Sequence, residues 1–230
     1  MSKKLVLLAG PTASGKSNLA IKLAKKLNGE IINADSMQIF KEFTVLSSRP
    51  TLNQTKKVKH HLYGIITVKK HFSAGEWLKK VKIKINTCVK KKKIPIIVGG
   101  TGLYFNTITK GISKIPDIDL KTRNKVRNLY KKLGIKKFYN ALIKLDPKSK
   151  GRILPTDSQR IQRAYEVKLK TKKSLYEWFE KTKSDFLEFD IRKIFIEIPR
   201  DILLNKISMR TEQMFKKKCI NEVKKFNKLK

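Results

Sequence analysis

Residues 10–17 carry the strongest chemical signal in this chain of 230 residues. They have the spacing G-x-x-x-x-G-K-S and follow the apolar run 5–9, so they lie where a buried strand runs into a helix. The two glycines let the loop N–H groups converge on an anion at the helix N-terminus. The ammonium of Lys16 suits phosphate oxygens, and the hydroxyl of Ser17 suits Mg²⁺. The pattern predicts a site for a phosphorylated compound, formed by Gly10, Pro11, Thr12, Ala13, Ser14, Gly15, Lys16 and Ser17.

A carboxylate follows the second predicted strand, residues 30–33. Because parallel strands end at one edge of a sheet, Asp35 is expected beside the phosphate loop. A carboxylate there can accept a proton from a nucleophile or bind a metal ion, and the alternative role is a helix N-cap. The adjacent Ser36 and Gln38 could hydrogen-bond a flat heterocycle, although each alone is a weak signal.

The apolar run 94–98 is expected to form a central parallel strand, and it is followed by Gly-Gly-Thr-Gly. An ordinary ATPase has an aspartate at the end of such a strand to hold Mg²⁺, and a GTPase has D-x-x-G and N-K-x-D. This chain has none of them, which favours a diphosphate leaving group over a nucleoside triphosphate. Thr101 would then contact the leaving group or the nucleophile; a plain turn between strand and helix is the alternative.

The net charge of +37 favours a polyanionic partner such as nucleic acid. Most of the charge comes from lysines spread along the chain, which an AT-rich coding bias would also produce. Arginine is more informative, because its planar fork binds phosphates and base edges. Arg160 and Arg163 share one face of a predicted helix, flanked by Gln159 and Gln162, which suits a polynucleotide.

A solvated helix face is the alternative explanation of those arginines. Arg123 and Arg127, four residues apart, form a second pair with weaker support.

Other classes of site and location are disfavoured. Cys88 and Cys219 lie far apart with no C-x-x-C, so ordinary thiols in a reducing compartment are expected. The three histidines have no metal-ligand spacing, so we expect no zinc site. The first apolar run is too short for a signal peptide, and no run approaches the length of a membrane span. We expect a cytoplasmic protein that does not associate with membranes.

The first half of the chain alternates apolar strands with amphipathic helices, the pattern of an α/β sheet. We expect strands at residues 4–9, 30–33, 64–68 and 94–98, and helices at 17–27 and 75–92. The run 194–198 is expected to add one more core strand.

Residues 116–188 predict helices only, with Asp119 and Asp157 as N-caps and a break at Gly134. The fold class is therefore α/β, a P-loop NTPase-like parallel sheet flanked by helices with an all-helical insertion. The core domain is expected to comprise residues 1–116 and 189–230, and the insertion residues 117–188.

Taken together, the motifs resemble the tRNA dimethylallyltransferase family, the tRNA isopentenyl (IPP) transferases. The similar segments follow one another along nearly the whole chain. Alone, only the phosphate loop is strong, but Asp-Ser-x-Gln and Gly-Gly-Thr-Gly-Leu-Tyr together exclude most other P-loop families. The similar segments are residues 10–17, 33–38, 60–62, 72–77, 98–105 and 157–163, with Arg210 and Met214.

The resemblance implies transfer of a dimethylallyl group from its diphosphate to N6 of adenosine 37, beside the anticodon of certain tRNAs. The phosphate loop would bind the diphosphate and Mg²⁺, and Arg210 would approach the diphosphate. Asp35 would accept a proton from the amine of an extruded base, and Thr101 would position substrate. The implied contacts to the tRNA anticodon stem-loop come from Asp35, Ser36, Met37, Gln38, Thr101, Arg123, Gln159, Arg160, Ile161, Gln162 and Arg163. We expect a monomer.

The chain departs from the family pattern at its C-terminal end. Cys219 stands where the family often has glycine, and family members usually continue for several tens of residues beyond Lys230. The expectation is a C-terminally short member, which keeps an inactive tRNA-binding remnant as one alternative. The other is an ATP-dependent small-molecule or nucleotide kinase, which would use the same loop and Asp35 but should carry an arginine-rich lid.

Overall fold

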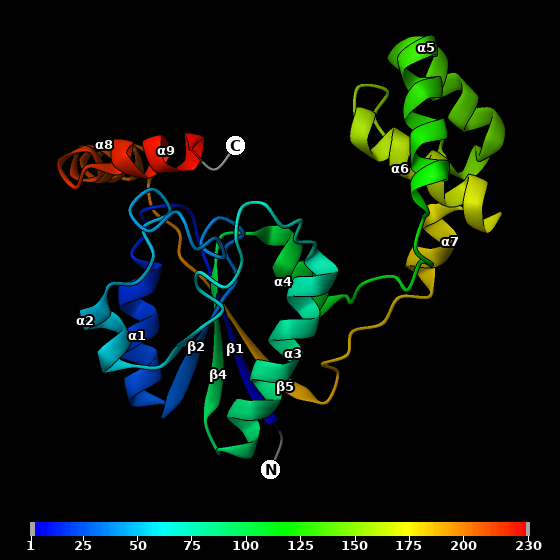
Figure 1. The fold of residues 1–230 in the computed structure, drawn as a ribbon. Helices are drawn as coiled ribbons and strands as arrows, with labels where there is room; N and C mark the ends of the chain where they lie inside the picture. Colours follow the sequence, from blue (N-terminus) through cyan, green and yellow to red (C-terminus); the bar gives the residue numbers. More distant parts are fainter. Residues whose placement is uncertain (1–2, 229–230) are drawn as a thin grey trace. The chain divides into compact units, whose positions relative to one another are not determined.

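The computed structural model describes residues 3–228 and divides into two compact units. The core unit runs up to Thr109 and resumes at Phe186, and the insertion unit is Lys110–Asp185. Figure 1 shows a sheet with helices in the core unit and helices alone in the insertion unit.

Each boundary between the two units lies a few residues before the boundary that the sequence predicts. The packing of the residues at these boundaries gives the reason. The chain enters the insertion unit near Gly111 and leaves it near Lys183. Gly111, with φ +91°, lies so close to the leaving segment that a Cβ on it would be 2.3 Å from the Lys183 carbonyl oxygen. The hydroxyls of Ser113 and Thr182 are 2.7 Å apart, so the two connecting segments belong together in the insertion unit. Phe186 is buried in the core of the other unit, where the core unit resumes.

The sheet of the core unit has five parallel strands in the order β3-β2-β4-β1-β5. Their bounds are β1 Lys3–Ala9, β2 Gly29–Asn33, β3 His60–His61, β4 Ile94–Gly99 and β5 Phe189–Phe195. The apolar runs of β1 and β4 are buried because both faces of the sheet are covered. The expected α/β parallel fold is confirmed.

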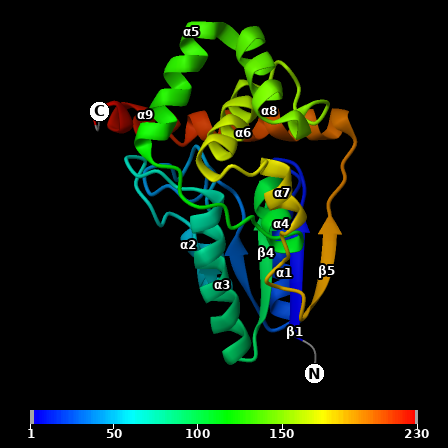
Figure 2. The same ribbon diagram turned by 90° about the vertical axis from the view of Figure 1, so that its right-hand side faces the viewer.

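Helices cover both faces of this sheet (Figures 1 and 2). Successive residues of β1 point to opposite faces, so Leu5 and Leu7 join one core cluster while Val6 and Leu8 join the other. Helix α1 (Lys16–Lys26) packs on the second cluster through Ala20 and Ala24. Helices α3 (Ala74–Lys90) and α4 (Gly102–Thr109) pack on the first, where Trp77 stacks on Tyr104 at 4.2 Å between ring centroids.

Three further helices complete the core unit. Helix α2 (Leu52–Lys57) begins with a capping box between Thr51 and Gln54. Helices α8 (Arg200–Lys216) and α9 (Cys219–Asn227) extend across the carboxyl-terminal edge of the sheet, as Figure 2 shows. No helix in residues 3–228 is long and apolar enough to cross a membrane.

The insertion unit is helical, as expected. It contains α5 (Leu120–Leu145), the 3-10 turn η1 (Pro147–Ser149), α6 (Ser158–Thr171) and α7 (Leu175–Glu180). Asp119 and Asp157 cap α5 and α6 by accepting from Thr122 N at 2.7 Å and Arg160 N at 3.0 Å. Gly134, with φ +68°, interrupts α5 where the break was predicted. Its core is Val126, Phe138, Leu142, Ile153, Ile161, Ala164, Val167 and Leu175.

Two strand predictions are wrong. Residues 64–68 form one isolated bridge, Phe40 with Ile66, because Leu62 and Gly64 both take left-handed φ angles that end an extended segment. The last strand ends at Phe195 rather than covering residues 194–198, and it is an edge strand with β1 as its one neighbour in the sheet. Phe195 is 69% exposed, so the apolar run marks an edge rather than a core strand.

The close packing of β4 against the end of β2 requires a glycine at position 99. A Cβ on Gly99 would lie 2.1 Å from the carbonyl oxygen of Ala34, so Gly99→Ala forces β4 away from the end of β2. We expect the free energy of unfolding to fall by about 3 kcal/mol in urea titrations. In the control Gly102→Ala no heavy atom lies within 4 Å of the new Cβ, and the change should stay below about 0.5 kcal/mol. Equal effects of the two substitutions would contradict the close approach.

Candidate active site

The phosphate loop connects β1 to α1 through two residues with left-handed backbone, Ala13 (φ 61°) and Gly15 (φ 87°). Gly15 is the N-cap of α1 and contributes no side-chain cap within the described chain. The first N–H groups of this helix are therefore available to an anion, together with the partial positive charge of the helix N-terminus. This is the geometry that the loop sequence predicted.

Lys16 folds back over the loop. Its ammonium donates to the carbonyl oxygens of Gly10 at 2.7 Å and Pro11 at 2.5 Å. Burial lowers the pKa of Lys16, the charge of Asp35 raises it, and the charge of Arg210 lowers it again. The loop lysine thus shares its surroundings with one carboxylate and one further cation.

The position of Asp35 is fixed by its backbone. Asn33, fully buried at the end of β2, accepts from Asp35 N at 2.8 Å and donates to Asp35 O at 3.0 Å and Leu62 O at 3.1 Å. The Trp77 indole donates to Asn33 O at 2.9 Å. One oxygen of the Asp35 carboxylate accepts from Met37 N at 2.9 Å, which closes a local turn. No helix begins at residues 36–39, so Asp35 is not a helix N-cap.

The phosphate loop, Asp35 and α8 surround a cavity of about 550 Å³. Arg210 reaches it from α8; burial lowers the pKa of this guanidinium and the charge of Asp35 raises it. Arg210 Nε and Ser14 Oγ are buried with no hydrogen-bond partner in the described residues. Buried donors of this kind need an acceptor, so the cavity suits an anion. Its lining also includes Thr12, Lys16, Ser17, Gln38, Tyr63, Gln213, Met214 and Lys217.

Thr101 forms hydrogen bonds with the backbone on both sides of Asp35. Its hydroxyl oxygen accepts from Ser36 N at 2.9 Å and lies 3.3 Å from Ser36 Oγ, and its own N–H donates to Ala34 O at 3.2 Å. In the described chain Thr101 is not among the residues that line the cavity. It holds the segment that follows Asp35 against the end of β4.

The segment after Asp35 is divided between the cavity and solvent. Gln38 lines the cavity, and its amide donates to Ser47 O at 2.9 Å and Ser48 O at 3.1 Å. Both N–H bonds of that amide are thus used to hold the 47–48 backbone. Met37 is 56% exposed.

On the insertion unit, all the polar residues predicted to contact tRNA except Arg123 lie at the start of α6. Gln159 and Arg160 are exposed, and Gln162 and Arg163 are half-buried. Arg160 pairs with Asp157 at 3.3 Å and Arg163 with Glu166 at 3.6 Å. The pairs leave most of each guanidinium's donors available for phosphate or bases.

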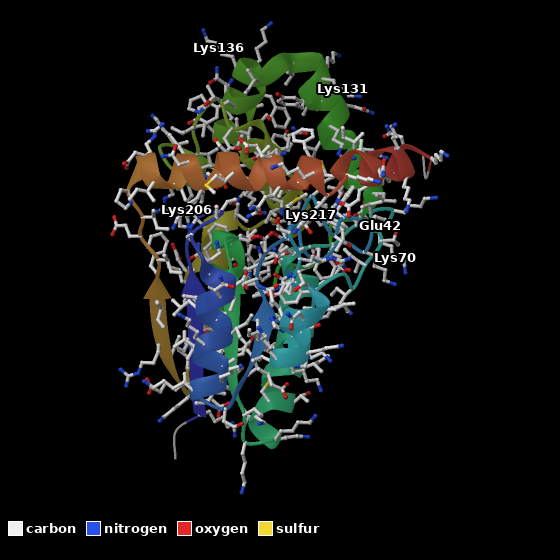
Figure 3. All side chains as sticks on the ribbon, turned by 90° about the vertical axis from the view of Figure 1, so that its left-hand side faces the viewer. Glu42, Lys70, Lys131, Lys136, Lys206 and Lys217 are labelled. Atoms are coloured by element: carbon white, nitrogen blue, oxygen red, sulfur yellow. The ribbon has the colours of Figure 1, made fainter. Side chains whose placement is uncertain are left out.

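Ile161 differs from its neighbours because it is fully buried in the core of the insertion unit. It anchors α6 rather than offering a surface. On α5, Arg123 is half-buried and its Nε has no partner in the described residues, whereas Arg127 is exposed. Figure 3 shows Lys131 and Lys136 extending outward from α5.

Several residues that line the cavity were missed by sequence reasoning, among them Arg49 and Tyr63. Arg49 lines the cavity, its Nη2 donating to Lys41 O at 3.1 Å and Thr44 Oγ1 at 2.5 Å, and it packs against Gly64. The one signal in the sequence for Arg49 was its residue type, because arginine in a lysine-rich chain suggests a specific contact to phosphate. Tyr63 also lines the cavity; burial raises its pKa, and the charge of Asp35 raises it further.

A buried cluster of Glu30, His61 and Cys88 lies outside this cavity. The Glu30 carboxylate is 2.6 Å from His61 Nε2 and 3.7 Å from Cys88 Sγ. Burial raises the pKa of Cys88 to about 12, and the charge and hydrogen bond of Glu30 act in the same direction. For Glu30, burial raises the pKa, but the hydrogen bond and charge of His61, the charge of Lys59 and the hydrogen bond of Cys88 together lower it below its usual value. The cluster ties β2, β3 and α3 together, and the cationic Lys59 disfavours a metal ion there.

Comparisons with known proteins place the chain in a family. The family model described as IPP transferase matches residues 38–230. The tRNA dimethylallyltransferase of Pelagibacter ubique is 54% identical over 227 residues, which is 99% of this chain and 72% of that protein. The chain belongs to the IPP transferase family. The tRNA dimethylallyltransferase of Rickettsia bellii is 40% identical over 96% of this chain and 70% of its own length.

Solved structures agree with this family assignment. A eukaryotic dimethylallyltransferase acting on tRNA superimposes with a TM-score of 0.86 at 28% identity, covering 99% of this chain. The chain spans 56% of the length of that protein. The full-length tRNA isopentenylpyrophosphate transferase of Bacillus halodurans gives a TM-score of 0.64 at 30% identity, over 98% of this chain and 70% of that one.

The shared surroundings of Lys16 predict pKa changes of opposite sign. Asp35→Asn removes a negative charge that favours the ammonium, so the pKa of Lys16 should fall, whereas Arg210→Ala removes a like charge and should raise it. A pH titration of the lysine Nζ signals by NMR measures both changes. Asp190→Asn, on the edge strand β5, is the matched control and should leave Lys16 unchanged. Shifts of the same sign in the two site variants would contradict the arrangement.

Proposed function

We propose that this chain transfers a dimethylallyl group from dimethylallyl diphosphate to N6 of adenosine 37 in tRNA. The observation that carries the proposal is the meeting of the phosphate loop, the Asp35 carboxylate and the half-buried Arg210 around one cavity. The names of the relatives support the same activity. The chain matches them over nearly all of its own length, including every segment that forms the cavity.

In this proposal the cavity binds the diphosphate of the donor. The loop N–H groups, Lys16 and Arg210 surround the oxygens on which negative charge grows as the allylic C–O bond breaks. The Ser17 hydroxyl and the Asp35 carboxylate both line the cavity, so the oxygen donors that Mg²⁺ prefers are present. Ser17 would hold the ion, which supplies further neutralisation of the diphosphate when bound.

Asp35 is the proposed general base. The exocyclic amine of the adenine forms a bond to the allylic carbon, pyrophosphate leaves with the electron pair of the broken C–O bond, and the amine proton passes to the carboxylate. Asn33 and the N–H of Met37 fix the position of this carboxylate. Because an adenine in a stacked anticodon loop cannot reach the cavity, the base has to be extruded. Ser36, Met37, Gln38 and Thr101, which follow or support Asp35, are the proposed contacts to it.

The insertion unit supplies the proposed contacts to the tRNA backbone and bases. Arg123, Gln159, Arg160, Gln162 and Arg163 carry donors at the surface or half-buried, in a chain with net charge +37. Ile161 supports them from the core. The compartment we propose is the cytoplasm, and we propose that one copy of the chain is sufficient.

The first test is transfer of a labelled allyl group to unmodified tRNA by wild-type protein and Asp35→Asn. Transfer should fall by about 10²- to 10⁴-fold in the variant, the usual contribution of a general base, while tRNA affinity changes little. Asp190→Asn is the control for the lost charge. Near-normal turnover of Asp35→Asn would contradict the assignment of the base.

Two binding measurements beside the transfer assay separate the alternatives. An ATP-dependent kinase would bind ATP tightly in calorimetry and would not respond to dimethylallyl diphosphate. A binding remnant would retain tRNA in a filter or mobility assay but would transfer no label. Either result would overturn the proposed activity.

The second prediction concerns the salt dependence of tRNA binding. Replacing Arg160 and Arg163 by alanine should weaken binding and lower the slope of log K against log salt by about one for each lost phosphate contact. Arg192→Ala, an exposed arginine of β5, controls for the loss of charge. An unchanged slope in the double variant would mean that both arginines face solvent in the complex.

A further inference from the structure

Glu222, on α9, makes an unusual contact with a segment far from it in the chain. Its carboxylate accepts three hydrogen bonds from consecutive backbone N–H groups, those of Thr44 at 2.9 Å, Val45 at 2.8 Å and Leu46 at 3.0 Å. Consecutive amides that converge in this way form an anion-binding nest, and bonds to a carboxylate are stronger than neutral ones. The contact therefore fixes α9 to this segment.

The segment that Glu222 binds is one wall of the cavity. Thr44, Val45, Ser48 and Arg49 all line it. The wall is also held from the side of Asp35, because the Gln38 amide donates to Ser47 O and Ser48 O. We refer to residues 44–49 as the cavity wall.

Helix α8, which precedes α9 in the chain, lines another side of the cavity. Arg210, Gln213, Met214 and Lys217 line the cavity from the C-terminal half of α8 and the residue that follows it. Figure 3 shows Lys217 between the α8–α9 ribbon and the loops that carry Glu42. Helix α9 starts two residues after Lys217, so a contact of α9 with the cavity wall sets the distance between the wall and α8.

A second contact of α9 with the loop before the wall supports this role. Phe226, one turn after Glu222, packs against Phe43 with 5.4 Å between ring centroids. Glu222 itself does not line the cavity in the described chain, so it acts on the cavity through the backbone that it binds.

We propose that Glu222 is a positioning residue for the reaction: it holds the cavity wall against α8 so that both surround the diphosphate of the allyl donor. The proposal rests on the proposed function for its substrate. The position of the wall against α9, in contrast, rests only on the three hydrogen bonds of Glu222.

The test compares Glu222→Gln with Glu222→Asp and with the control Glu212→Gln. The glutamine keeps the shape of the side chain but loses the charge and presents an N–H₂ group to the nest, and aspartate keeps the charge on a shorter chain. Glu212 is an exposed acidic residue of α8, so its substitution matches the change in net charge. Hydrogen exchange at the amides of residues 44–46 and the affinity for inorganic pyrophosphate with Mg²⁺ are measured first, then the KM and kcat of transfer.

In Glu222→Gln we expect exchange at residues 44–46 to accelerate by about tenfold or more, since the hydrogen bonds to a charged acceptor are lost. Pyrophosphate affinity should fall, and the KM for dimethylallyl diphosphate should rise, by about tenfold with a smaller change in kcat. Glu222→Asp should lie between Glu222→Gln and wild type, and Glu212→Gln should match wild type.

Two results would overturn the proposal. One is Glu222→Gln with the exchange, affinity and KM of Glu212→Gln. The other is loss of the entire fold in Glu222→Gln and Glu222→Asp, since the proposed role is confined to the wall. Absence of transfer by the wild-type protein would instead overturn the proposed function, and the exchange and pyrophosphate data would still decide the role of Glu222.

Discussion

The site depends on the Asp35 carboxylate held close to two half-buried cations of the cavity, Lys16 and Arg210. Burial lowers the pKa values of both Lys16 and Arg210, and each cation is partly compensated by Asp35. One carboxylate cannot balance two cations, and the bonds of Lys16 to the Gly10 and Pro11 carbonyls complete its coordination without adding charge. In the proposed function, the diphosphate of the donor would supply the missing negative charge, and Asp35 would act as the base beside both cations.

This balance of charge requires an accurate position for Asp35, which comes from the buried framework beneath it. Asn33 uses its amide to bind the backbone of Asp35 on both sides, and Trp77 binds the Asn33 carbonyl while stacking on Tyr104. The close approach of Gly99 to Ala34 brings β4 to the same edge, where Thr101 holds Ser36. The core of the sheet and the Asp35 carboxylate are therefore parts of one hydrogen-bonded structure.

Most of the fold could be predicted from the sequence because it depends on local patterns. The phosphate loop, the caps at Asp119 and Asp157 and the break at Gly134 each follow from a few neighbouring residues. The edge strand β5 was misplaced because an apolar run does not reveal how many neighbours a strand has. The boundaries of the insertion likewise depend on which side Gly111 and Phe186 pack, which no local pattern contains.

The candidate site likewise has a part that could be predicted from local sequence and a part that could not. The part of the cavity lined by residues 12–17 and Asp35 could be predicted, because the loop motif and the order of the strands place these residues at one edge of the sheet; Gly10 and Pro11 of the same motif do not line the cavity in the described chain. The cavity wall could not be predicted, because the three hydrogen bonds that Glu222 accepts join residues 176–178 positions apart in the sequence. A carboxylate that binds backbone amides leaves no signature at the amide positions, since every residue type except proline has the same N–H group. Such contacts constrain the sequence little, yet in our proposal this one sets the distance between the cations of α8 and the phosphate loop, where the diphosphate would bind.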